Sequence, residues 1–105
     1  MITEIVVLGG GYTGVWAARA AAGAGARVRL VAADPDHSFH GWTAEVITGH
    51  VRPERARVPL ADLLPGVEIV LGRVESVSLT QQTVRVATDR GHRHLAYDEL
   101  VVAVG

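Results

Sequence analysis

The sequence has 105 residues, a formal net charge of −1 and no cysteine. This length suffices for one small domain, and the lack of cysteine excludes disulfides, thiolate metal sites and redox-active cysteine pairs. The near-neutral charge gives no reason to expect nucleic acid or an anionic membrane as a partner. The N-terminus, with the acidic Glu4 and a glycine-interrupted apolar run, does not fit a signal peptide, and no apolar stretch reaches the ~20 residues of a membrane span. We therefore expect a cytoplasmic protein.

The first third of the chain predicts a βαβ unit. Thr3–Leu8 is expected to be a buried parallel strand, because its apolar residues run without alternation. A glycine-rich turn follows, and the alanine-rich stretch from about Tyr12 to Ala22 predicts a helix. Only Arg19 is charged in that helix, so we expect most of its faces to be covered or closely packed. Arg27–Ala32 is the second strand, which completes the unit within about 30 residues.

The glycine turn has the G-x-G-x-x-G spacing of dinucleotide-binding units, at Gly9, Gly11 and Gly14. In that pattern Gly9 permits the sharp turn, Gly11 lets a pyrophosphate approach the backbone, and Gly14 lets the helix pack close to the strand. The unpaired N–H groups at the helix start, where Tyr12 and Thr13 lie, face the anion together with the positive end of the helix dipole. The turn contains no Lys or Arg and no G-K-[ST] ending, so it is not a triphosphate-hydrolysing P-loop. We expect dinucleotide binding here, and the alternative is an ordinary glycine turn.

The middle of the chain is less regular. Asp34-Pro35-Asp36 predicts a turn, and His37–Gly41 predicts a loop. Trp42–Gly49 is ambiguous and could form a short helix that ends at Gly49. Val51–Arg57 is polar and predicts an exposed connection. Pro59 is suited to a helix start, with Leu60, Leu63 and Leu64 on one side and Pro65-Gly66 as the end.

The last part of the chain predicts strands. Val67–Leu71 is the next strand, and a small antiparallel β-meander follows at about residues 73–96, in which short β-rich runs alternate with turns. Glu99–Val104 is a continuous apolar run and predicts a buried strand that returns to the main sheet. The predicted fold class is therefore α/β, a Rossmann-like parallel sheet with a small antiparallel β-meander insertion.

The order of these motifs resembles the FAD domain of the pyridine nucleotide-disulfide oxidoreductase-like flavoproteins, and within them the type II NADH dehydrogenases. The likeness rests on His37-Ser38-Phe39, Ala44–Gly49, Pro59–Leu64 and Tyr97–Gly105, and it covers essentially the whole chain. It implies that residues 1–105 form a single, partial FAD/NAD(P)-binding domain, because the family continues into an NADH domain.

The resemblance also implies further cofactor-binding residues. The backbone contact to adenine falls near Val74, which is equally a candidate core residue, and Ala103 and Gly105 permit close backbone approach to the cofactor. The family has an acidic residue at the end of the second strand for the ribose hydroxyls, whereas this chain has Ala32. Asp34 either replaces that acid or is an ordinary turn residue. A second departure is Val104, where the family has threonine.

No metal site and no catalytic side chain are predicted. His92 and His94 share one face of a short strand, but zinc needs a converging third or fourth ligand, so solvated histidines are the better interpretation. For Glu45, packing or capping is preferred over an acid/base role. For Trp16, a core position or partner contact is preferred over stacking on a flavin, and Trp42 is left undecided. In the family, the flavin itself takes and passes on the hydride.

The resemblance implies the FAD-binding part of an NAD(P)H-oxidising flavoprotein oxidoreductase with a quinone or similar acceptor, inactive as this chain alone. NAD(P)H would be the substrate of the complete enzyme. The alternatives are a non-catalytic or vestigial dinucleotide-binding module and a domain that binds NAD in place of FAD. Missing C-terminal domains or a second copy of the chain would complete the site.

Overall fold

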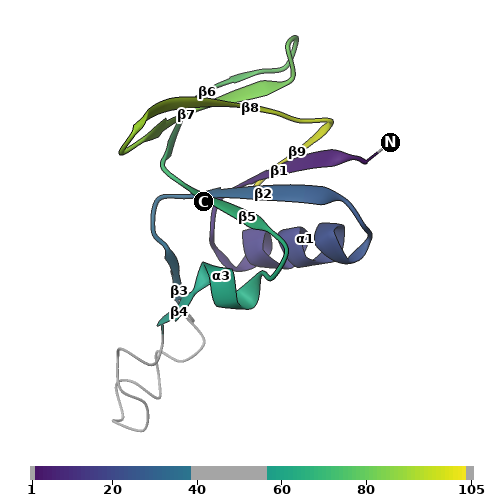
Figure 1. Cartoon of the computed structure of the whole chain (residues 1–105), viewed down its shortest axis with the longest axis vertical. Helices are drawn as coiled ribbons and strands as arrows, with labels where there is room; N and C mark the ends of the chain where they lie inside the picture. The colour runs from purple at the N-terminus through teal and green to yellow at the C-terminus, as the bar shows by residue number, and fades with distance from the viewer. Residues whose placement is uncertain (1, 39–56, 104–105) are drawn as a thin grey trace, which may run out of the picture.

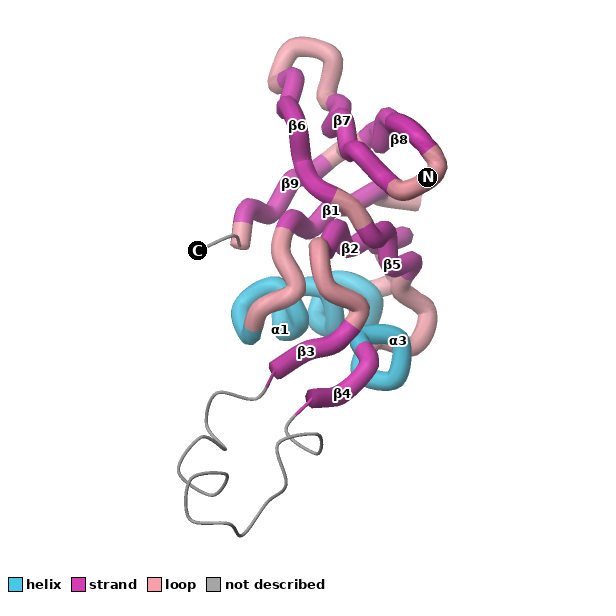
Figure 2. Tube along the Cα trace, turned by 90° about the vertical axis from the view of Figure 1, so that its left-hand side faces the viewer, coloured by secondary structure: helices cyan, strands magenta, loops and turns pink. Residues whose placement is uncertain are grey.

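The structure, a computed structural model, describes residues 2–38 and 57–103. Its main sheet has four parallel strands in the order β5-β2-β1-β9, with bounds β1 Glu4–Leu8, β2 Arg27–Ala32, β5 Glu68–Leu71 and β9 Glu99–Val102. Helices α1 (Tyr12–Gly23) and α3 (Leu60–Leu63) cover one face of this sheet. An antiparallel sheet of β6 (Arg73–Ser78), β7 (Thr83–Thr88) and β8 (Gly91–Ala96) covers the other (Figures 1 and 2). The predicted fold class is confirmed.

Strand β1 is buried on both faces, as its unbroken apolar run predicts. Ile5 and Val7 point to the helices, and Val6 and Leu8 point to the antiparallel sheet, because alternate residues of a strand face opposite sides. All four are at most 8% exposed. Full burial of a valine or leucine side chain contributes about 1.5–3 kcal/mol to the stability of the fold. Strand β1 therefore stabilises two hydrophobic clusters, one on each face of the sheet.

Helix α1 follows its predicted bounds within one residue, but only one of its faces is covered. Val15 and Ala18 are buried against the sheet, whereas Tyr12 is 65% exposed and Trp16 is 53% exposed. The expectation that most faces of this helix are covered is therefore wrong, as is a core position for Trp16. The physical reason is that the parallel sheet lies on one side of α1 only, and Trp16 instead contacts the guanidinium of Arg19, 5.4 Å from the ring centroid.

Strand β9 returns to the main sheet beside β1, as predicted, but it is not buried. Its four residues are exposed or half-buried, and Val102 is 63% exposed. The correction has a topological reason, because among the described strands β9 pairs with β1 alone and lies at the edge of the sheet. An unbroken apolar run indicates a parallel strand but does not say whether a neighbour lies on both sides.

A further sheet of two short strands was not predicted from the sequence. β3 (Asp36–Ser38) pairs with β4 (Arg57–Pro59) in antiparallel register, so the predicted loop at His37 and the predicted connection at Arg57 are wrong at these positions. Two three-residue strands far apart in the sequence carry no hairpin signal, which explains the error. The ambiguous interval Trp42–Gly49 lies outside the described residues.

The β-meander matches its predicted range, because β6, β7 and β8 run from Arg73 to Ala96. It joins the main sheet through Gly72. An added Cβ at Gly72 would overlap the Ala87 carbonyl oxygen and lie 2.7 Å from a Val86 methyl carbon, so only glycine permits this close crossing from β5 to β6. The crossing places the start of β6 beside the end of β2.

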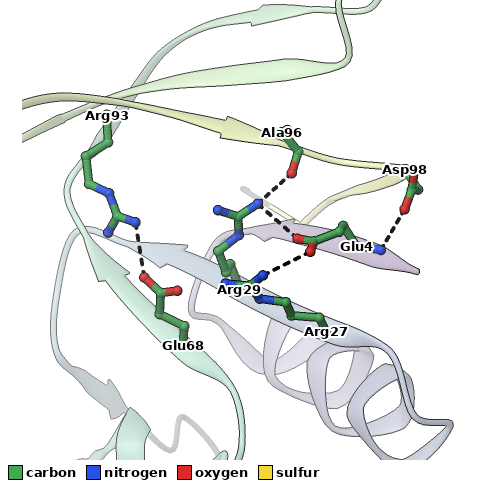
Figure 3. A network of polar contacts seen from close by, with 7 residues as sticks. All are labelled: Glu4, Arg27, Arg29, Glu68, Arg93, Ala96 and Asp98. Carbon is green, nitrogen blue, oxygen red and sulfur yellow. Dashed lines mark hydrogen bonds and ion pairs between the residues drawn. The ribbon is translucent and has the colours of Figure 1, made fainter. Parts of the chain in front are cut away.

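A polar network links the first residues of β1 and β2 to the connection between β8 and β9 (Figure 3). Glu4 accepts from Arg27 and Arg29, each at 3.2 Å, and its backbone N–H donates to Asp98 Oδ2 at 2.7 Å. Arg29 also donates to the Ala96 carbonyl oxygen at 2.6 Å, which links β2 to the end of β8. The Arg29 side chain is 13% exposed and that of Arg27 is 62% exposed, so solvent screens the Arg29 contacts far less.

We predict that Arg29→Ala lowers the free energy of unfolding by about 1–3 kcal/mol, because two hydrogen bonds of a nearly buried charged group are lost. The control is Arg27→Ala, which removes an exposed contact to the same carboxylate and should cost about 0–1 kcal/mol. Urea unfolding followed by circular dichroism measures both. Equal losses for the two variants would contradict this account of the network.

Candidate functional site

The glycine turn between β1 and α1 has the conformation that its spacing predicts. Gly9 has a φ of 113°, a value that residues with a side chain rarely adopt. Its N–H donates to the Val31 carbonyl oxygen at 2.8 Å, which ties the turn to β2. The sharp exit from the strand at Gly9 is therefore confirmed.

Gly14 has a packing role. It is buried in the first turn of α1, and a Cβ built there would overlap the Gly9 carbonyl oxygen and lie 3.6 Å from Ala103 Cβ. Only a hydrogen atom fits between the helix and the turn at this position. The close helix–strand contact assigned to Gly14 from the sequence is therefore confirmed.

Gly11 differs from both of these glycines. Its backbone is extended, with a φ of −76° and a ψ of −174°, which any residue can adopt. A Cβ built on Gly11 meets nothing within 4 Å. Neither backbone strain nor packing within the described chain requires glycine here, so the space above Gly11 is a cradle that a side chain would fill.

The first turn of α1 presents backbone donors toward that cradle. The first hydrogen bond of the helix runs from the Val15 N–H to the Gly11 carbonyl oxygen at 3.0 Å, so the N–H groups of Tyr12, Thr13 and Gly14 lack an intrahelical acceptor. No side chain caps the helix and no acidic residue lies in its first turn. These donors and the helix dipole make the position suited to an anion.

A cavity of about 630 Å³ opens beside the turn. It is lined by Gly9–Gly11, by residues 31–33 at the end of β2, by residues 72–74 at the start of β6, and by Ala103 after β9. These segments meet because the carboxyl ends of parallel strands lie at one edge of the sheet, where β2 and β9 flank β1. Its volume lies within the range of small-molecule and cofactor sites.

Hydrogen bonds between backbone groups hold the lining segments in place. Gly72 N–H donates to the Ala32 carbonyl oxygen at 2.9 Å, and Ala103 N–H donates to the Leu8 carbonyl oxygen at 2.8 Å. The first bond fixes the start of β6 against the end of β2. The second fixes the end of β9 against the last residue of β1. The cavity walls are therefore parts of the sheet framework.

The structure brings together part of the predicted set. Gly9, Gly11, Val74 and Ala103 line the cavity. Val74 also packs partly buried against the antiparallel-sheet cluster, so it has both of the positions considered for it. Tyr12, Thr13 and Gly14 form the adjoining helix start.

Asp34, which was also predicted to contact the cofactor, is not part of this lining. It lies in an exposed bend after β2, whereas Ala32 lines the cavity. Val104 and Gly105 lie outside the described residues.

Sequence reasoning missed several lining residues, among them Gly10, Gly72 and Arg73. An added Cβ at Gly10 would lie 3.1 Å from both Ala32 Cβ and Leu60 Cδ1, so this glycine lets the turn pack on β2 and α3. Gly72, the crossing point from β5 to β6, also lines the cavity. Arg73 begins the predicted meander, and the crossing at Gly72, which bonds to Ala32, places it beside the cavity.

No group of three or more His, Asp or Glu side chains among the described residues could hold a metal ion. His92 Nε2 lies 3.0 Å from Glu75 Oε1, and Arg85 lies 3.1 Å from the same oxygen.

Neither helix in residues 2–38 and 57–103 has the length and apolar composition of a membrane span.

Comparison with known proteins identifies the family. Residues 3–105 match the family model described as pyridine nucleotide-disulphide oxidoreductase. The chain belongs to this family. A type II NADH:quinone oxidoreductase from Mycobacterium tuberculosis is 30% identical to this chain over 97% of the chain's length. The resemblance inferred from the ordered motifs is therefore confirmed.

Solved structures share the fold. The sulfide:quinone oxidoreductase of Aquifex aeolicus superposes with a TM-score of 0.79 at 28% identity, over 98% of this chain and 24% of that one. NDH2 from Plasmodium falciparum, solved in complex with NADH, gives a TM-score of 0.85 at 16% identity, over 100% of this chain and 22% of that one. This chain also spans 23% of the Mycobacterium tuberculosis relative, so it corresponds to about a quarter of such proteins.

The steric roles of the two glycines lead to a prediction. Gly14→Ala should lower the free energy of unfolding by about 1–3 kcal/mol or more, because the new methyl group overlaps the Gly9 carbonyl oxygen. Gly11→Ala should leave it within about 0.5 kcal/mol, because its methyl group enters open space. Urea unfolding of both variants measures the difference. A destabilised Gly11→Ala variant would show that Gly11 is required for folding rather than for a ligand.

Proposed function

We propose that this chain is the FAD-binding part of an NAD(P)H-oxidising flavoprotein oxidoreductase that passes electrons to a quinone or similar acceptor. The observation that carries the proposal is the cradle above Gly11, which folding does not require and which opens onto a 630 Å³ cavity. Family membership supports a flavin and a pyridine nucleotide as the reactants of the whole protein. The relative from Mycobacterium tuberculosis is named as an NADH:quinone oxidoreductase, which suggests the acceptor.

In this proposal the pyrophosphate of FAD lies against Gly11 and the first turn of α1. The N–H groups of Tyr12, Thr13 and Gly14 donate hydrogen bonds to it, so the turn needs no cationic side chain. The adenosine half extends toward the end of β2 and the backbone near Val74, and the flavin half extends past Ala103. The bound flavin would supply the hydride chemistry, and the chain would bind and orient it.

Gly11→Val tests whether the cradle is the cofactor site. The valine side chain would occupy the proposed pyrophosphate position, so we expect FAD affinity to fall at least about tenfold, or about 1.4 kcal/mol. FAD fluorescence titration measures the affinity, and circular dichroism checks the fold. The matched control is Gly23→Val, because an added Cβ at Gly23 also meets nothing within 4 Å and lies at the far end of α1. Equal FAD affinities for Gly11→Val and wild type would refute the site.

A second candidate is a dinucleotide-binding module that takes no part in catalysis, with FAD or NAD bound. Ala32 favours it, because a methyl group replaces the carboxylate that the related proteins are expected to use for the ribose hydroxyls. We propose that Asp34 supplies the ribose contact in place of that carboxylate. This contact requires the exposed bend that contains Asp34 to move toward the ligand. The two candidates share the glycine cradle and differ in whether turnover occurs when the remaining domains are supplied.

We predict that the 105-residue chain with added FAD does not oxidise NADH. Hydride transfer needs the nicotinamide ring held against the flavin in near-attack geometry, and we propose that a further domain or a second copy of the chain holds it. NADH absorbance in the presence of a soluble quinone is the measurement. Turnover on the order of 1 per second or faster would contradict the prediction, because these residues would then build a complete active site.

Two features of the chain fit its proposed setting. We propose a single, partial FAD/NAD(P)-binding domain over residues 1–105, in a cytoplasmic protein without cysteine. The exposed edge at Val102 and the exposed aromatic side chains of Tyr12 and Trp16 are surfaces that further domains or a second copy would cover.

A further inference from the structure

Contacts from β2, α1 and α3 hold the glycine turn. The Gly9 N–H donates to the Val31 carbonyl oxygen at 2.8 Å, which fixes the turn to β2. The Gly9 carbonyl oxygen lies against Gly14 at the start of α1. Leu60, the first residue of α3, contacts the turn from a third element, because a Cβ added at Gly10 would lie 3.1 Å from Leu60 Cδ1 and 3.8 Å from Leu60 Cδ2. The backbone of Gly10 therefore packs directly on the methyl groups of this leucine.

Leu60 reaches the turn from a side that the cavity does not. Its side chain is 0% exposed and is not among the residues that line the cavity, whereas Gly10 is. The Leu60 N–H donates to the Pro35 carbonyl oxygen at 2.8 Å, which ties the start of α3 to the bend after β2. Leu60 also belongs to the hydrophobic cluster between the helices and the main sheet. Its methyl groups are therefore held in place by close packing and by this backbone bond.

The position of the turn decides how well its backbone donors meet an anion. An N–H···O hydrogen bond has a preferred length of about 2.7–3.2 Å, so a shift of a fraction of an ångström weakens it. Removal of a buried leucine leaves a space that the surrounding structure fills only in part. Gly10 has no side chain that would keep the turn from moving into such a space.

We propose that Leu60 is a positioning residue of the candidate cofactor site. Its methyl groups fix Gly10, and through Gly10 they fix the distance between the backbone donors of the turn and the ligand. The inference rests on the proposed function, because it takes the cradle above Gly11 as the pyrophosphate site. It adds to that site a residue of α3 that touches no ligand and lies outside the G-x-G-x-x-G motif.

Leu60→Ala and Leu64→Ala form a matched pair. Both leucines are buried in the same cluster, at 0% and 2% exposure, so both variants should lower the urea midpoint of unfolding. Leu64 follows the end of α3 and lines a separate cavity beside the last residues of α1. We expect Leu60→Ala to bind FAD about tenfold more weakly than wild type, and Leu64→Ala to match wild type within about twofold.

Fluorescence titration of the intact chain with FAD measures these affinities, where circular dichroism shows each variant to be folded. Leu60→Met conserves the side-chain volume and should retain the wild-type affinity. If the alanine variants do not fold, the milder pair Leu60→Val and Leu64→Val carries the same comparison, with a smaller loss expected for Leu60→Val.

Hydrogen exchange of the Gly9 amide is a second readout, and it needs no ligand. The Gly9 N–H is bonded to Val31, so its exchange requires the turn to open locally. We expect this exchange, measured by NMR relative to the amides of β1 in the same variant, to be faster in Leu60→Ala than in Leu64→Ala.

The outcomes separate this inference from the proposed function. Equal FAD affinities in the two alanine variants would overturn the role of Leu60 and leave the cradle standing, even if Gly9 exchange differs. Failure of wild type to bind FAD would refute the proposed function. Gly9 exchange would then decide whether Leu60 positions the turn: selective acceleration in Leu60→Ala would support this role, and equal exchange in the two variants would overturn it.

Discussion

The contact between the first turn of α1 and the carbonyl oxygen of Gly9 is the constraint on which the other features depend. Only glycine at position 14 lets the helix start so close to the end of β1. That closeness directs the helix N-terminus at the space beside the strand ends, and it carries Val15 and Ala18 down onto the sheet. The same contact therefore establishes both the helix-side core and the orientation of the backbone donors that face the cavity.

Burial of β1 on both faces explains why the antiparallel sheet is present. Val6 and Leu8 would be exposed if β7 and β8 did not cover them with Val84, Val86 and Leu95. The connection from the main sheet to the antiparallel sheet is short, because Gly72 lets the chain cross directly from β5 into β6. The network around Glu4 holds the opposite end of the same interface, through Arg29 and the Ala96 carbonyl oxygen (Figure 3). The antiparallel sheet therefore covers one face of the core through β7 and β8 and lines the cavity through the start of β6.

The cavity is built from two kinds of segment. At the glycine turn, backbone N–H groups and the positive end of the α1 dipole face the cavity, and such groups suit an anion. At the far end, the lining includes Ala32 at the end of β2 and Arg73 at the start of β6. The glycine turn is formed by neighbours in the chain, whereas the far end is assembled from segments that only the sheet brings together.

The sequence by itself determined the local units, because each is encoded by neighbours in the chain. The spacing of Gly9, Gly11 and Gly14, the unbroken apolar run of β1 and the turn residues of the meander specify their structures within a few residues, and the ordered motifs identified the family. Tertiary structure alone decided what depends on neighbours distant in sequence: the edge position of β9, the pairing of β3 with β4, the exposed outer face of α1 and the arrival of Arg73 at the cavity. A periodic pattern reports that a face is apolar or that a turn is possible. Such a pattern does not indicate which strand lies at the edge of the sheet. It also does not indicate which residue the connection from β5 to β6 places beside the end of β2.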